Sequence, residues 1–360
     1  MSATDRGQLH RRLLRWFDKA KRDLPWRRTQ DPYAIWVSEI MLQQTRVDTV
    51  IGHYEPFLQR FPTVKALAAA APEDVLAEWS GLGYYRRARM LHDGAKQVQA
   101  QHGGKLPKTQ AELSTIKGFG PYTSGAVASI AFGQAAPLVD GNVARVFARH
   151  QGLRLPIKSK AAVKACWALA NEWMPSHRPG DWNQALMELG ATVCTPRAPR
   201  CEACPWAKTC VAYAQGTTQE LPVVERKAAS PLEWRTALIA RKGNQVLLGQ
   251  RPLEARFGGM WEPPMVSGRV SPPKVLATFR ASLGLAASKI TFRGSFEHVL
   301  THRRLMTDVF EGRATSVPAV TSPDYLKYAW FTEDQLAQKK AVGLSTFARR
   351  ALALAAKEHA

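Results

Sequence analysis

Four of the five cysteines fall close together in the chain, at Cys194, Cys201, Cys204 and Cys210. Their C-x6-C-x2-C-x5-C spacing puts four thiols into one compact loop, which can hold either a zinc ion or an iron–sulfur cluster. In an intracellular chain such a group indicates a metal site rather than disulfide bonds. The fifth cysteine, Cys166, lies in an apolar helical stretch and is expected to be a core residue.

Glu39 is a carboxylate among apolar neighbours, in the segment IWVSEIMLQQT at 35–45. If Glu39 is partly buried, desolvation raises its pKa and keeps a proton available near neutral pH. The alternative is an exposed residue on an amphipathic helix, which periodicity alone favours. Gln43 lies four positions after Glu39 and is therefore its neighbour on one helical face.

A second carboxylate follows a glycine-rich turn. The stretch IKGFGPYT at 116–123 contains Gly118 and Gly120, and such glycines let the backbone turn tightly and approach a ligand. Backbone amides at the start of the next helix can bind a phosphate, although an ordinary helix–helix turn has the same composition. Asp140 follows in the stretch LVDGNV at 138–143. By itself, Asp140 would be interpreted as a helix cap.

The elements that must position these residues differ between the two halves of the chain. Residues from 8 to about 215 are expected to be mostly helical; Asp31 and Pro32 suit a helix start, and apolar residues then recur at close to helical period as far as Tyr54. A polar stretch at 215–233 is expected to be a linker. The domains expected are therefore 1–214, mainly α, and 234–360, α+β. Further helices are expected at 63–79, 86–101, 109–116, 124–131, 143–150, 158–174, 271–283 and 344–355, and strands at 235–241, 245–250, 290–296 and 304–311.

The composition indicates a polyanionic partner. Lys and Arg number 50 against 29 Asp and Glu, a formal net charge of +21, and such an excess favours nucleic acid. Solvated surface charge alone is the alternative, because a binding patch also requires the charges to cluster. The chain contains no apolar run near the ~20 residues that span a bilayer, and residues 1–17 lack the apolar core of a secretory signal. We therefore expect a soluble, intracellular monomer, cytoplasmic and associated with the nucleoid.

The stretch from 116 to 143 resembles the helix-hairpin-helix-Gly/Pro-Asp motif of DNA glycosylases, and the cysteine spacing resembles the cluster loop of the endonuclease III superfamily. The segment around Glu39 resembles the signature of the MutY family of adenine glycosylases. These resemblances imply a helix-hairpin-helix fold, a 4Fe–4S cluster on the four cysteines, and base-excision repair of adenine mispaired with 8-oxoguanine or guanine in double-stranded DNA. A zinc site would usually bring two C-x2-C pairs, and only Cys201 and Cys204 form one.

Breaking an N-glycosidic bond requires an acid that protonates the base and a carboxylate that stabilises the sugar cation. The resemblance gives these roles to Glu39, which would protonate adenine at N7 and later help activate water, and to Asp140, which would stabilise the cation or a covalent sugar intermediate. Tyr122 and Asn142 match family positions that support this pair by hydrogen bonding. Lyases of the endonuclease III type carry a nucleophilic lysine where this chain has Tyr122, so a monofunctional enzyme is expected.

Two rival functions remain. One is an endonuclease III-like glycosylase and lyase for oxidised pyrimidines, against which Glu39, Tyr122 and the C-terminal extension argue. The other is a non-catalytic, cluster-bearing DNA-binding protein, which the retention of both Glu39 and Asp140 argues against.

An enzyme of this class must extrude its base from the duplex and fill the gap with a wedge. Gln44 and Tyr84 match intercalating residues of the family, and Leu82 lies beside Tyr84 in the stretch GLGYYRR at 81–87. Core packing is the alternative for Leu82 and Tyr84. The predicted DNA-binding residues are Gln43, Gln44, Thr45, Leu82, Tyr84, Gly118, Gly120, Thr301 and His302.

Thr301 and His302 belong to the C-terminal half, which resembles a Nudix fold with MWEPP at 260–264 near the signature loop. A Nudix hydrolase needs carboxylates that bind a divalent metal, and the corresponding helix, VLATFRASL at 275–283, lacks them. A binding module is therefore expected. In the MutY family this domain recognises 8-oxoguanine through a Phe-Ser-His loop, which here matches Leu300, Thr301 and His302, with Leu in place of Phe and Thr in place of Ser.

Overall fold

The computed structural model describes residues 3–225, 230–316, 322–338 and 341–356. The chain forms two compact units, one of Met1–Ala69 with Asp93–Lys227 and one of Ala70–His92 with Ala228–Ala360. This division groups residues 70–92 with the C-terminal half, which the sequence did not indicate. The domain boundaries expected at 214 and 234 stay predictions.

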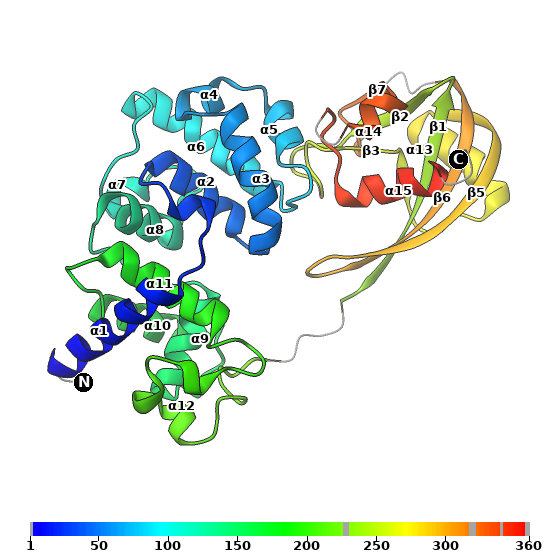
Figure 1. Cartoon of the computed structure of the whole chain (residues 1–360). Helices are drawn as coiled ribbons and strands as arrows, with labels where there is room; N and C mark the ends of the chain where they lie inside the picture. The colour runs from blue at the N-terminus through cyan, green and yellow to red at the C-terminus, as the bar shows by residue number, and fades with distance from the viewer. Residues whose placement is uncertain (1–2, 226–229, 317–321, 339–340, 357–360) are drawn as a thin grey trace. The chain divides into compact units, whose positions relative to one another are not determined.

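The first unit is helical throughout (Figure 1). One helix, α6, begins among residues of the second unit and continues into the first. The elements of the first unit are α1 Ala3–Ala20, η1 Pro25–Arg27, α2 Pro32–Leu42, α3 Val47–Arg60, α4 Val64–Ala69, α6 Arg86–His102, α7 Gln110–Leu113, α8 Pro121–Phe132, α9 Gly141–Gln151, α10 Lys160–Glu172, α11 Pro179–Thr192, η2 Cys201–Ala203, η3 Ala207–Thr209 and α12 Val211–Ala214.

Helix α2 lies inside the first unit and packs against α3 and α8. Asp31 caps its N-terminus by accepting a hydrogen bond from the Tyr33 amide at 3.0 Å, and Pro32 occupies the first turn, where no amide is needed. All residues from Tyr33 to Met41 are buried. The apolar residues that recur at helical spacing as far as Tyr54 belong to two helices, α2 and α3, rather than one. The chain breaks between them, where Gln44 takes a left-handed backbone with φ of 57°.

A core of aromatic residues joins the N-terminal helix to the cysteine-bearing end of this unit. Leu9, Leu13 and Phe17 of α1 are buried with Trp182 and Trp206, and the Trp206 indole donates a hydrogen bond to the Leu9 carbonyl at 3.1 Å. Cys166 is 1% exposed in the same core, which confirms the prediction of a core residue.

The second unit is built on a seven-stranded sheet with the order β3-β2-β1-β6-β5, to which β4 adds beside β1 and β7 beside β2. Strands β1 and β6 run parallel, and the other pairs are antiparallel. The elements are α5 Pro72–Glu78, β1 Leu232–Lys242, β2 Gln245–Gln250, β3 Trp261–Glu262, β4 Met265–Ser267, η4 Pro272–Lys274, α13 Val275–Leu283, β5 Ala286–Val299, β6 Arg304–Ser316, β7 Lys327–Thr332, α14 Glu333–Ala337 and α15 Thr346–Ala356.

The two faces of this sheet carry separate cores. Alternate residues of β1 point to opposite faces: Ala237 and Ile239 pack in the core that includes α15, and Leu238 and Ala240 pack in the core that includes α13. The four predicted strands and both predicted helices are present, and the strands β3, β4 and β7 and the short helix α14 were not predicted. No helix in the described segments is long and apolar enough to cross a membrane.

Candidate active site and cysteine loop

Glu39 and Tyr122 form a buried pair between α2 and α8. Glu39 is only 4% exposed, and the Tyr122 hydroxyl donates a hydrogen bond to its Oε2 at 2.5 Å. Burial raises the pKa of Glu39 to about 7, with the charge of Asp140 adding to the rise, while the hydrogen bond from Tyr122 opposes it. The alternative of an exposed Glu39 is therefore wrong, and the carboxyl can hold a proton near neutral pH.

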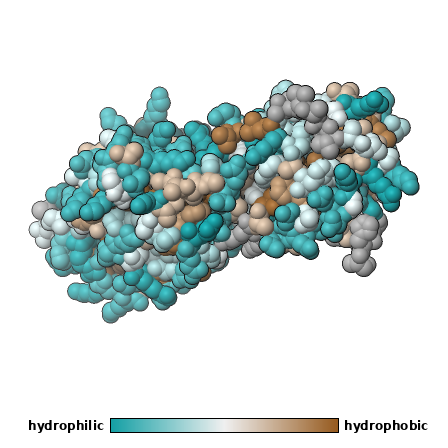
Figure 2. All heavy atoms as spheres, turned by 90° about the horizontal axis from the view of Figure 1, so that it is seen from above, coloured by the Kyte–Doolittle hydropathy of each residue, from teal (hydrophilic) through white to brown (hydrophobic). Residues whose placement is uncertain are grey.

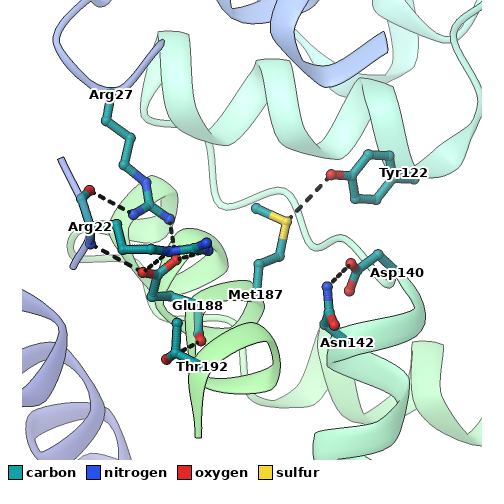
Figure 3. A network of polar contacts seen from close by, with 8 residues as sticks. All are labelled: Arg22, Arg27, Tyr122, Asp140, Asn142, Met187, Glu188 and Thr192. Carbon is teal, nitrogen blue, oxygen red and sulfur yellow. Dashed lines mark hydrogen bonds and ion pairs between the residues drawn. The ribbon is translucent and has the colours of Figure 1, made fainter. Parts of the chain in front are cut away.

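Tyr122 remains a phenol in this environment, because burial and the nearby charge of Glu39 raise its pKa well above the ordinary value. Its hydroxyl also lies 3.4 Å from the Met187 sulfur on α11 (Figure 3). The tyrosine therefore bridges the helices that carry Glu39 and Met187.

Asp140 uses its two carboxylate oxygens differently. Oδ1 accepts a hydrogen bond from the Val143 amide at 2.7 Å and so caps α9, and Oδ2 accepts one from the Asn142 side chain at 2.9 Å (Figure 3). Burial raises the pKa of Asp140, and these hydrogen bonds counteract the rise. The cap interpretation holds, and the same carboxylate also acts electrostatically on Glu39.

A hydrogen-bonded connection runs from Asp140 to the cysteine loop. Arg145, 8% exposed, donates from Nη2 to Asn142 Oδ1 and to the Gly190 carbonyl, both at 2.8 Å. Its Nε donates to the Cys194 carbonyl at 2.8 Å. Sequence reasoning missed Arg145, although its position three residues after Asn142, on the same helical face, was an available signal.

Glu188 of α11 is the centre of a second network that the sequence did not indicate. Its side chain is 1% exposed and accepts hydrogen bonds from Arg22 Nε at 2.8 Å and Nη2 at 2.9 Å, and from Arg27 Nη2 at 2.8 Å (Figure 3). Burial alone would raise the pKa of Glu188, but the two arginines lower it to about 2. The charge of Arg27 also lowers the pKa of Glu39.

The three polar candidates that follow Glu39 lie at the break between α2 and α3. The Gln43 amide donates to the Thr123 hydroxyl at 3.2 Å, and the Thr45 hydroxyl lies 3.5 Å from the Gln43 carbonyl. Gln44, with its positive φ, is at the apex. Of the two hairpin glycines, Gly118 takes a positive φ of 87°, whereas Gly120 has φ of −85° and precedes α8 as its N-cap.

In the second unit, Tyr84 and Thr301 are joined by a hydrogen bond. Tyr84 is 45% exposed and has a positive φ of 49°, and its hydroxyl lies 2.8 Å from the Thr301 hydroxyl. Thr301 and His302 are exposed in the turn between β5 and β6. Leu82 is 5% exposed, which favours its alternative as a packing residue over that of a wedge.

The four clustered cysteines lie in the loop from α11 to α12, close enough to influence one another electrostatically. Burial raises the pKa of Cys201, Cys204 and Cys210, and the neighbouring thiolates, Cys194 among them, raise it further. The buried Arg149 guanidinium lies 3.4 Å from the Cys194 sulfur. Among the described residues, no three His, Cys, Asp or Glu side chains are arranged to share a single metal ion.

A cavity of about 640 Å³ opens beside Asp140 in the first unit. Its walls come from the start of α9, from α10 and from residues 219–224. Asp140 is part of the lining, whereas Glu39 and Tyr122 are not. Asp140 therefore borders open space of the size of known ligand sites.

Comparison with known proteins assigns both halves to families. Residues 37–172 match the HhH-GPD superfamily of base excision DNA repair proteins, and residues 235–354 match the NUDIX domain. A human adenine DNA glycosylase is 37% identical over 386 residues, which cover 90% of this chain and 70% of the human protein. An adenine DNA glycosylase of Schizosaccharomyces pombe is 34% identical, over 90% of this chain and 85% of that protein.

Solved structures agree on the fold of the helical half. A thermostable thymine-DNA glycosylase superposes with a TM-score of 0.55 and 31% identity, over 59% of this chain and 100% of that chain. A trapped endonuclease III–DNA covalent intermediate gives a TM-score of 0.51 at 20% identity, over 60% of this chain and 99% of that one, which shows the fold alone. The predictions of a helix-hairpin-helix glycosylase fold and a Nudix-like second half are confirmed.

Proposed function

The chain belongs to the adenine DNA glycosylase family, and on this premise we propose that it hydrolyses the N-glycosidic bond of adenine mispaired with 8-oxoguanine or guanine in duplex DNA. The observation that carries the proposal is the buried Glu39 carboxyl, whose pKa of about 7 lets it hold a proton at neutral pH. An adenine anion is a poor leaving group, so the reaction needs that proton.

Glu39 is the general acid in this proposal. It donates its proton to adenine N7 as the bond to the sugar breaks, and its carboxylate then helps to activate the attacking water. Positioned acid catalysis of this kind contributes on the order of 10²–10⁴ in rate. The Tyr122 hydroxyl orients the Glu39 carboxyl through their 2.5 Å hydrogen bond.

Asp140 stabilises the sugar cation, as an electrostatic partner or through a covalent intermediate. Its fixed orientation supports this role, because the Val143 amide and the Asn142 side chain each hold one oxygen. The cavity that Asp140 helps to line supplies open space beside this residue. Since Tyr122 stands where lyases carry lysine, the chain has no amine nucleophile at that position and excises the base without Schiff-base strand cleavage.

The four cysteines would hold a 4Fe–4S cluster. Four thiols within one short loop suit iron–sulfur ligation, and Arg149 contacts the first and the last of these cysteines, Cys194 and Cys210. When bound, the cluster supplies a rigid cross-link of the loop and a redox-capable centre. Cys194, Cys201, Cys204 and Cys210 would be the ligands, and Arg149 offers positive charge beside Cys194. Iron, sulfide and zinc contents of anaerobically purified protein test this assignment.

Lesion recognition is assigned to the second unit. Undamaged adenine carries no mark of its own, so selectivity depends on the opposite base. Thr301 and His302, exposed in the β5–β6 turn, offer a hydroxyl and an imidazole to the altered edge of 8-oxoguanine, and Tyr84 lies within hydrogen-bonding distance of Thr301. Gln44 and Tyr84 are the wedge residues, while Gln43, Thr45 and the turn at Gly118 and Gly120 contact the DNA.

A panel of duplexes tests the proposal. The full chain is incubated under single-turnover conditions with duplexes that contain adenine opposite 8-oxoguanine, adenine opposite guanine, thymine opposite guanine, or thymine glycol, and each sample is split for treatment with and without alkali. We expect excision from both adenine duplexes, with strand breaks only after alkali. Excision confined to thymine glycol, with breaks before alkali, would instead establish the endonuclease III-like alternative.

A further inference from the structure

The N-terminal helix α1 carries a row of cations on its solvent face. Arg11, Arg15 and Lys19 recur every four residues, and Arg12 lies beside them; all four are exposed. At about 100° per residue, they occupy roughly 100° of the helix circumference. We call these four residues the basic stripe.

The basic stripe is held in place by the opposite face of the same helix. Leu9, Leu13 and Phe17 are at most 3% exposed in the core of the first unit. Arg178 donates two hydrogen bonds to Asp18, at 2.5 and 3.1 Å, and so fixes the end of the helix. The stripe is therefore a fixed surface rather than a loose basic tail.

The stripe also lacks the partners that usually compensate such charge. Like charges four residues apart destabilise a helix, yet among the described residues no carboxylate forms an ion pair with any of the four cations. Asp18, the nearest acid to Lys19 in sequence, is engaged by Arg178. A row of uncompensated cations on a rigid surface suits an external polyanion.

We propose that the basic stripe is an auxiliary docking surface for the phosphate backbone of duplex DNA, outside the excision site. Residues four apart lie ~6 Å apart along a helix, so the stripe spans ~12 Å, and DNA carries one negative charge per ~1.7 Å of its axis. Several cations can therefore meet phosphates at once. Such contacts carry no sequence information, and they prolong residence on undamaged DNA.

The same helix does not suit a membrane. Amphipathic helices bind lipid by burying their apolar face among acyl chains, and in α1 that face is already buried in the protein core. The proposal rests on the proposed function only in taking duplex DNA as the polyanion, and it is independent of which base is removed.

The test measures how binding of a long, undamaged duplex depends on salt. Each phosphate contact contributes ~0.9 to the slope of log K against log salt. Changing all four stripe residues to Gln should reduce the magnitude of the slope by about 2 to 4, and should leave single-turnover excision at saturating enzyme unchanged. An unchanged slope in this variant would count against the stripe, even if excision were lost. Because the slope is measured on undamaged DNA, this outcome is distinct from a failure of the proposed function, which would appear as no adenine excision by the unmodified chain.

Two matched variants isolate the cause. A charge-conserving variant, with Arg11, Arg12 and Arg15 changed to Lys and Lys19 to Arg, should keep the slope of the unmodified chain. A second control changes four exposed lysines outside the stripe to Gln and so loses the same net charge. These lysines are Lys65, Lys96, Lys242 and Lys274. The slope of this control should change by less than the ~0.9 that one phosphate contact contributes. An equal loss in this control, or stripe-dependent flotation with anionic lipid vesicles but no effect on DNA, would overturn the proposal.

Discussion

The pair of Glu39 and Tyr122 combines an acid that is half-protonated near neutrality with a phenol that stays protonated. Their 2.5 Å hydrogen bond favours the charged form of Glu39, while burial and the charge of Asp140 favour the neutral form. Burial prevails, and the pKa of Glu39 is about 7. If Glu39 must be protonated to act, the excision rate should fall as the pH rises through this value.

Removing the phenol oxygen should move that pH limb. In Tyr122→Phe, Glu39 loses the hydrogen bond that lowers its pKa, so the pKa rises and the decline in excision shifts to higher pH. The absolute rate should also fall, because the carboxyl is no longer oriented. Single-turnover rates from mildly acidic to alkaline pH measure both effects. A limb that stays in place, or moves to lower pH, would show that another group controls it.

At the scale of elements, α11 is tied to the segment before α2 by one buried carboxylate. Glu188 accepts hydrogen bonds from Arg22 and Arg27, and its neighbour Met187 touches Tyr122. Removing one partner of a buried ion pair leaves uncompensated charge, which typically costs about 3–5 kcal/mol. The network therefore stabilises the surroundings of the proposed acid.

Glu188→Gln should lower the free energy of unfolding at neutral pH by on the order of 3 kcal/mol. The pKa of Glu188 is about 2 in the folded chain against an ordinary 4.5, so its stabilisation is present above pH 4.5 and is lost as the pH falls towards 2. The difference between the two proteins should therefore shrink in acid. Denaturant unfolding at several pH values measures it.

Glu172→Gln is the matched control, because it breaks the exposed pair of Arg6 and Glu172 at 2.9 Å. Exposed pairs are worth about 0–1 kcal/mol. Equal effects of the two substitutions, or a Glu188→Gln difference that persists unchanged in acid, would contradict the account.

The sequence predicted the elements better than their connections. The cap at Asp31, the helical first half and the strands of the second half follow from local patterns. The break after Gln43 did not, because apolar residues continue at helical period on both sides of it. Glu188 was missed for a different reason: it meets Arg22 and Arg27 across more than 160 residues, and no local pattern reports such partners. For Leu82, the flanking glycines suggested exposure, whereas the side chain is only 5% exposed.

At the scale of the whole molecule, the proposed chemistry and the proposed lesion recognition belong to different units. Glu39, Tyr122 and Asp140 lie in the first unit, and Tyr84, Thr301 and His302 lie in the second. Substitutions in the β5–β6 turn should therefore change the choice between duplexes and leave the chemistry of excision intact.

Thr301→Ala/His302→Ala should lower the ratio of excision rates for adenine opposite 8-oxoguanine over adenine opposite guanine. A single lost base contact costs ~1–3 kcal/mol of discrimination, which corresponds to about 5- to 150-fold. Single-turnover rates of the full chain on the two duplexes give the ratio. Asn244→Ala, in the exposed turn between β1 and β2, is the control and should leave it unchanged. An unaltered ratio in the double variant would move lesion recognition away from this turn.

The central claim is that Glu39 supplies the proton for adenine excision. Its most direct test is a single-turnover assay of the full chain and of Glu39→Gln on a duplex with adenine opposite 8-oxoguanine, with DNA binding measured in parallel. The amide preserves the shape of the side chain and has no acidic proton, so we predict complete excision by the unaltered chain, a loss of at least ~10² in rate for the variant, and nearly equal DNA binding. Substantial residual excision by a folded, DNA-binding Glu39→Gln variant would contradict the account.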